Sequence, residues 1–132
     1  MSDKEYEKQK ARVNKYREKW FDTLGLGWYE VKLNWSQLED RENHDTAAKT
    51  TWRWQYRSAE ITFFLPAFVD LDDDDVESIV VHEFAHILTG PMVQNAPDEN
   101  TQLMEYGTEC VARALIWARL AGENKLNKGR KK

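Results

Sequence analysis

The chain has 132 residues, of which 41% are apolar and 32% charged, so it suits one domain with a buried core. A formal net charge of −4 at pH 7 excludes nucleic-acid binding driven by the charge of the whole chain. The single cysteine, Cys110, excludes an internal disulfide framework and fits a reducing compartment.

The sequence contains no recognisable targeting or membrane-spanning segment. The first residues, Met1 to Glu5, lack the character of a signal peptide. No apolar run approaches the roughly 20 residues that a transmembrane helix needs. We therefore expect a soluble, cytoplasmic protein.

The first third of the chain predicts one helix and one strand. Charged residues surround an irregular apolar stripe over residues 3–22, which is typical of an amphipathic helix packed on the domain. Gly25 follows and marks the turn after this helix. Residues 28–35 alternate between apolar and polar side chains, as a half-buried strand does. Residues 36–48 are polar and without periodicity, which indicates a loop.

Two further strands are predicted before the centre of the chain. Residues 49–57 alternate, and we expect this strand to bury its aromatic face rather than to stack on nucleic acid. Residues 60–65 form the third strand, and the short Ser58-Ala59 segment predicts a hairpin turn between the two. The buried face would consist of three aromatic residues: Trp52, Trp54 and Tyr56.

An apolar helix is predicted after a run of acidic residues. Residues 72–75 are all aspartate, which suits a helix start because aspartate caps the N-terminus and interacts favourably with the macrodipole. The helix should extend over residues 74–88. Residues 89–91, Thr-Gly-Pro, should then end it, because glycine forms a left-handed cap and proline cannot continue the helix.

A second helix should follow a turn-rich loop at residues 91–98. Asp98 or Asn100 would cap it, and it would run to about residue 120. Cys110, in its middle, is expected to be a small core residue. Four apolar residues form the predicted buried stripe: Leu103, Val111, Leu115 and Ala118.

The end of the chain differs in charge from the rest. Residues 122–132 carry five Lys or Arg and one Glu, which leaves a charge of −8 on residues 1–121. Their Gly-, Asn- and Lys-rich composition predicts a basic, disordered tail outside a single domain of residues 1–121. We expect no membrane partner, and no nucleic-acid partner apart from weak contacts of this tail.

The most specific pattern in the chain is His82-Glu83-x-x-His86, the H-E-x-x-H motif of zinc hydrolases. Positions i and i+4 of a helix share one face, so the two imidazoles can reach one ion. Glu83 points to the side of that pair and suits a general base for metal-activated water. Burying these polar groups among apolar neighbours is costly unless a metal satisfies them. The alternative is a pair of core histidines with ordinary hydrogen bonds.

A catalytic zinc site needs a third protein ligand and leaves one position open for water. The only other histidine, His44, lies far upstream in a predicted loop, and one cysteine is a poor source of ligands. Glu105 and Glu109 are better placed, because a spacing of four puts both carboxylates on one face of the second helix. Either carboxylate could complete the site.

These residues resemble the gluzincin pattern of thermolysin-like and aminopeptidase-type zinc peptidases over roughly residues 59–120. They also resemble the small single-domain HExxH proteins of phages and prophages. The resemblance implies that Glu105 is the third ligand and that Glu109, four residues later, braces a metal-binding histidine. Glu109 also offers an alternative ligand register. The strand at 60–65 would be a sheet edge that pairs with an extended peptide substrate.

The sequence therefore predicts a minimal zincin-like α+β domain, with a helix, a three-stranded sheet, the motif helix and a Glu-bearing helix. The expected function is a small zinc metallopeptidase that holds one zinc ion with His82, His86 and Glu105 and uses Glu83 as general base. Tyr106 would pack at the core or rim, or contact an oxyanion or substrate. The alternative is a phage or prophage interaction protein on a zincin-like scaffold, which binds a host protein or DNA and has a structural or vestigial zinc site.

Overall fold

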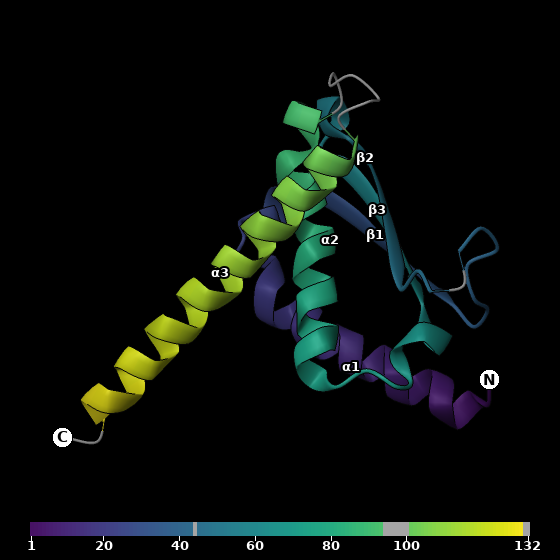
Figure 1. Ribbon diagram of the computed structural model, residues 1–132, viewed down its shortest axis with the longest axis horizontal. Coiled ribbons are helices and arrows are strands. Elements are labelled where there is room, and N and C mark those ends of the chain that lie inside the picture. Colours follow the sequence, from purple (N-terminus) through teal and green to yellow (C-terminus); the bar gives the residue numbers. More distant parts are fainter. Residues whose placement is uncertain (44, 94–100, 131–132) are drawn as a thin grey trace.

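The structure is a computed structural model that describes residues 1–43, 45–93 and 101–130 (Figure 1). Of residues 92, 93, 101 and 125–130 it describes the backbone only. His44 and most of the predicted loop at 91–98, with both candidate caps that follow Pro97, lie outside the described residues. The chain forms α1 (Asp3–Phe21), β1 (Glu30–Ser36), β2 (Ala48–Arg53), β3 (Ser58–Phe64), α2 (Asp73–Val93) and α3 (Thr101–Arg130).

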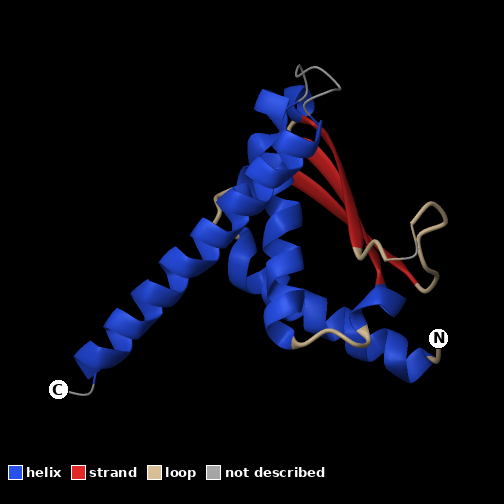
Figure 2. Ribbon diagram, in the orientation of Figure 1, coloured by secondary structure: helices blue, strands red, loops and turns tan. Residues whose placement is uncertain are grey.

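The three helices lie on one side of the three-stranded sheet, as Figure 2 shows. This arrangement confirms the predicted α+β class and its order of elements. The strand order is β1-β3-β2, with β1 parallel to β3 and β2 antiparallel to it. No helix in the described ranges has the length and apolarity that crossing a membrane requires.

The central strand of the sheet is β3. The expectation that the strand at 60–65 is an edge is therefore wrong. The physical reason lies in its side chains, because Ala59, Ile61 and Phe63 are all buried, and the middle of a sheet is where a strand buries most surface. Among the described strands, the edges are β1 and β2, and β2 is the one that contacts α2.

The hairpin between β2 and β3 turns earlier than predicted. Strand β2 ends at Arg53, and a 3₁₀ turn at Trp54–Tyr56 followed by Arg57 with φ of 52° reverses the chain. The predicted burial of Trp54 and Tyr56 is therefore wrong, since they are 38% and 76% exposed. A 3₁₀ turn breaks the two-residue alternation on which that prediction rested.

Helix α2 is the centre of the core. The Asp72 side chain accepts a hydrogen bond from the Asp75 N–H, as the predicted capping role requires. The buried residues of α2 contact the sheet on one side of the helix and contact α1 and α3 on its other sides. They include Val76, Val80, Phe84 and Ile87, at the helical spacing expected from the sequence.

Helix α2 does not stop at residues 89–91 as predicted but continues to Val93. Gly90 serves close packing instead of a cap, because a Cβ there would lie 2.6 Å from Trp52 Nε1. Pro91 lies inside the helix, in its last turn, where it has no N–H to donate to the carbonyl of residue 87, and the helix ends two residues later.

Helix α3 buries a different stripe from the one predicted. Thr108 and Ala112 are buried and Ile116 is half-buried, whereas Leu103 is 67% exposed and Cys110 is also exposed. The predictions for Leu103, Cys110, Val111 and Ala118 are therefore wrong, and only Leu115 contacts the core. The helix has apolar residues on two faces, so its periodicity alone does not identify the inner one.

Over residues 122–130, where the sequence predicted a disordered tail, α3 continues to Arg130 (Figure 1). Arg119 fastens this part of the helix. Its guanidinium donates to the Lys19 carbonyl and the Thr23 hydroxyl on the α1 side, and to Glu123 one turn ahead. An i,i+4 pair of this kind spans Gly122 and favours the helical conformation. Residues 131 and 132 lie outside the described part of the chain.

Candidate metal centre

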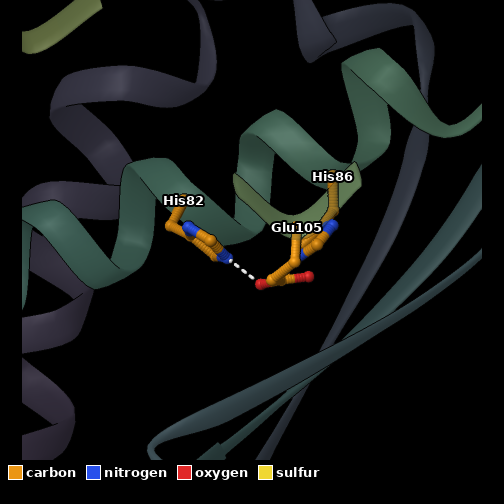
Figure 3. Close-up of side chains that lie close together, drawn as sticks. All are labelled: His82, His86 and Glu105. Atoms are coloured by element: carbon orange, nitrogen blue, oxygen red, sulfur yellow. Dashed lines mark hydrogen bonds and ion pairs between the residues drawn. The ribbon is translucent and has the colours of Figure 1, made fainter. Parts of the chain in front are cut away.

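The structure brings the side chains of His82, His86 and Glu105 together (Figure 3). The two histidines come from successive turns of α2, and Glu105 comes from the start of α3. A Glu105 oxygen lies 2.6 Å from His82 Nε2 and 3.4 Å from His86 Nε2. One ligand atom from each of the three residues lies within 4.8 Å of the others.

This donor set fits a zinc ion. Tetrahedral bonds of about 2.0–2.1 Å place ligand atoms roughly 3.3 Å apart, which is close to the separation of His86 Nε2 and Glu105. The shorter contact between His82 and Glu105 is a hydrogen bond that a metal would replace. Two imidazoles and one carboxylate are also the types of ligand found at catalytic zinc sites.

Glu109 contacts the opposite side of the His82 ring. Its carboxylate lies 2.6 Å from His82 Nδ1, and it accepts a second hydrogen bond from Arg113 Nε at 2.9 Å. Glu109 is therefore placed to brace a ligand, and it does not belong to the group of three. Burial raises the pKa of Glu109, but the hydrogen bonds from Arg113 and His82 outweigh burial and lower it.

His82 has a carboxylate on each ring nitrogen. Burial lowers the pKa of His82, but the hydrogen bond with Glu105, the charge of Glu83 and the hydrogen bond with Glu109 outweigh it and raise the pKa above 6.5. In the metal-free site a doubly protonated imidazole satisfies both carboxylates. Metal binding at Nε2 would displace one proton and leave the other on Nδ1, where Glu109 accepts it.

Glu83 lies between the histidines and the sheet. It is only 6% exposed and accepts a hydrogen bond from the Thr50 hydroxyl of β2. Burial raises the pKa of Glu83, although the Thr50 hydrogen bond and the charges of the two histidines act in the opposite direction. A carboxyl group with a raised pKa is suited to accept a proton and hold it during a reaction.

Trp52, also on β2, stacks on His86. The two ring centroids are 5.9 Å apart and the planes differ by 12°. Thr50 and Trp52 are two residues apart and therefore project from the same face of β2 toward α2. Sequence reasoning did not assign either to the site, although the predicted inward direction of Trp52 also implies an inward Thr50.

Tyr106 lies next to Glu105 and is 68% exposed, so the structure places it outside the core. Its suggested contact with an oxyanion or substrate stays a prediction. A pocket of about 480 Å³ opens beside His82. Its lining includes His82, Glu83 and Glu109 together with apolar walls from Ala47, Ala48, Leu71 and Ile79.

Comparisons of the chain with protein-family models, with curated proteins and with solved structures found no match.

Proposed function

We propose that the protein is a small zinc-dependent metallopeptidase. The observation that carries the proposal is a buried carboxyl group, Glu83, held beside a three-residue group whose donor atoms suit zinc. Structural zinc sites are closed by four protein ligands, whereas catalytic sites have three and an open position. Within the described residues the donor group has three members, and a pocket opens beside one of them, His82.

When bound, zinc would supply a Lewis acid that polarises a carbonyl group and activates water. His82, His86 and Glu105 would hold the ion. Glu109 would keep the Nδ1 proton of His82 in place, so that Nε2 faces the metal.

Glu83 would act as the general base. It would accept a proton from the attacking water and deliver that proton to the leaving nitrogen of the peptide bond. The Thr50 hydroxyl would keep the Glu83 carboxyl group oriented while its protonation state changes. The high cost of burying a charged carboxylate favours transfer of the proton to Glu83.

The substrate would be an extended peptide. Strand β2 pairs with β3 on one side, and its other side pairs with no described strand, so its backbone could add a peptide strand. The Thr50 side chain of β2 contacts Glu83. The edge formed by β2 therefore lies closer to the site than β3, the strand that the sequence predicted to be the edge. The pocket walls at Ala47, Ala48, Leu71 and Ile79 would accept an apolar side chain.

A closed coordination sphere, with both Glu105 and Glu109 bound to the ion, would support the alternative of a structural zinc site. The contact of Glu109 with His82 Nδ1 weighs against this arrangement, because it directs that carboxylate away from the other donor atoms.

The decisive experiment compares wild-type protein with Glu83→Gln. We expect both to bind one zinc ion in native mass spectrometry, since Glu83 is not a ligand. We expect the variant to lose peptide hydrolysis by a factor of about 10² or more, in line with the loss of a general base. A peptide mixture with varied apolar residues provides the substrates, and wild type with a chelator is the control.

Two results would reject the proposal. One is the absence of zinc binding in wild type after reconstitution. The other is full hydrolytic activity of the Glu83→Gln variant.

A further inference from the structure

Helix α3 exposes an apolar face that the core does not use. We call it the α3 outer face and define it by residues that recur every three or four positions. Its large members are strongly exposed, since Leu103, Tyr106 and Trp117 have 67%, 68% and 76% of their surface accessible. All its members are exposed: Leu103, Tyr106, Gly107, Cys110, Ala114, Trp117 and Ala121.

The α3 outer face lies opposite the side that packs on α2. The inner side consists of Thr108, Ala112 and Ile116, which follow each other at four-residue spacing. Beyond the contacts of Arg119 and Glu123 with the α1 side, the C-terminal end of α3 extends away from the sheet and the other helices, as Figure 1 shows. A contiguous exposed apolar stripe of this size is unusual for a monomer and marks an interaction surface.

The order of large and small residues on the α3 outer face is self-complementary. In an antiparallel pair centred near Ala112, Leu103 of one copy is level with Ala121 of the other, and Cys110 is level with Ala114. Trp117 is level with Gly107 and lies beside Tyr106, so the indole can enter the space over the glycine and contact the tyrosine ring. Large side chains that meet small ones allow two helices to pack closely.

A parallel pair lacks this complementarity. It would place Trp117 against Trp117 and Gly107 against Gly107, so that one level is overfilled and another is left empty. The antiparallel arrangement has a twofold axis, and every contact is then made twice.

The charge of the α3 outer face also favours a second copy of the same chain. None of its seven members is charged. Two copies of a chain with net charge −4 repel each other in general, but their outer faces would meet without opposing like charges. Each aromatic residue can bury up to about 150–250 Å². With the other side chains, this approaches the roughly 600 Å² per partner at the small end of specific interfaces.

We therefore propose that the protein forms a twofold homodimer through antiparallel packing of the α3 outer faces. The interface is small, so the dimer should be weak and depend on concentration. The proposal does not depend on zinc or on peptidase activity.

The first test measures the molar mass of the full-length protein by sedimentation equilibrium over a concentration series, with and without zinc. Wild type should approach twice the monomer mass at high concentration. Trp117→Glu should remain monomeric, because it would bury a charge on each side of the interface. The matched control is Tyr56→Glu, which changes an aromatic residue of equal exposure on the hairpin and should dimerise as wild type does. Circular dichroism checks that both variants are folded.

The second test fixes the arrangement by disulfide formation. Ala114→Cys places a thiol level with Cys110 of the second copy, so mild oxidation should give a covalent dimer on a non-reducing gel. The control, Ala118→Cys, lies on a level away from Cys110 and should remain largely monomeric.

Either of two results would overturn the proposal. One is a monomer at every concentration, which would leave the α3 outer face to a different protein. The other is rapid formation of a Cys110–Cys110 disulfide in wild type, which would require a parallel pair or an antiparallel pair centred at residue 110 instead of residue 112.

Discussion

The two helices that form the metal group are held very differently by the rest of the protein. Helix α2 lies between the sheet, α1 and α3, and its His82 and His86 side chains are each 16% exposed. Helix α3 packs along one stripe, and its Glu105 side chain is 57% exposed. One half of the site is therefore fixed by the core, and the other half is brought to it by a lightly packed helix.

This contrast teaches which part of the site the fold determines. The positions of the histidines follow from the packing of α2, so a metal would meet them in nearly their final geometry. Glu105 must leave its hydrogen bond with His82 when a metal binds, and its exposure allows that movement. The following predictions test this division, from the largest expected effect to the smallest.

Removing a ligand from the fixed half should have the largest effect. A zinc binding free energy of roughly 10–16 kcal/mol shared by three protein ligands and one water is about 2.5–4 kcal/mol each, so His86→Ala should weaken binding about 10²–10³-fold. Glu105→Ala should weaken it by only about tenfold to 10²-fold, because water can occupy the place of an exposed carboxylate. Competition with a chromogenic chelator measures both constants. A greater loss for Glu105→Ala than for His86→Ala would reverse the comparison.

Glu109 should matter for affinity without being a ligand. Glu109→Gln retains the shape of the side chain but weakens the hydrogen bond to His82 Nδ1, and we expect zinc affinity to fall about 10–100-fold. The measurement is the same competition assay, with zinc stoichiometry from native mass spectrometry. Arg113→Gln is the control, since it removes only the outer partner of Glu109 and should have a smaller effect. Loss of the ion itself in Glu109→Gln would make Glu109 a direct ligand.

Thr50 should affect turnover and leave metal binding unchanged. Thr50→Val removes the hydroxyl that donates to Glu83 but retains the shape, so we expect kcat to fall about tenfold, with KM and zinc affinity near wild type. Thr50→Ser restores the hydroxyl and should recover most of the activity. Steady-state kinetics on one peptide distinguishes the variants. Equal activity of the Val and Ser variants would show that the hydroxyl has no role in orientation.

The raised pKa of His82 predicts opposite pH effects on the metal-free and zinc-loaded protein. Because protonation is favoured in the folded state, the stabilisation is fully present below the ordinary pKa of 6.5 and is lost as the pH rises through the folded value. The Tm of metal-free protein should therefore fall over this range. Zinc competes with the proton, so zinc affinity should rise over the same range.

Thermal unfolding in the presence of a chelator measures how the Tm of the metal-free protein depends on pH. Zinc titrations at several pH values measure how zinc affinity depends on pH. His82→Asn should make the Tm of the metal-free protein depend less on pH. A Tm of the metal-free wild type that rises with pH in this range would contradict the proposed state of His82.

Local patterns in the sequence predicted the helices and strands and the shared helix face of His82 and His86, because helix and strand periods depend on neighbouring residues. The four-residue spacing of His82 and His86 directly implies a shared face. The order of the strands could not be predicted in this way, since alternation in β3 indicates burial but not which strands lie beside it. Thr50 and Trp52 were missed as members of the site for the same reason, because their partners are more than 30 residues away along the chain.

The inner face of α3 was predicted wrongly for a different reason. This helix has apolar residues on opposite sides. On the outer side Leu103, Cys110 and Trp117 follow a seven-residue repeat, which is as regular as the four-residue spacing of the inner residues. A hydrophobic period identifies a helix but cannot rank two apolar faces. The continuation of α3 beyond residue 121 was not predicted, because composition does not register the hydrogen bonds of Arg119 to the α1 side of the protein.

Strand β2 links the edge of the sheet to the candidate metal centre. It contacts the proposed general base, Glu83, through Thr50 and a candidate metal ligand, His86, through Trp52, while its outer side pairs with no described strand. A peptide added to that side would order the same strand from which both contacts arise. Substrate binding and alignment of the reactive groups would then be one event, and a short peptide that pairs poorly would be turned over slowly even when it fills the pocket.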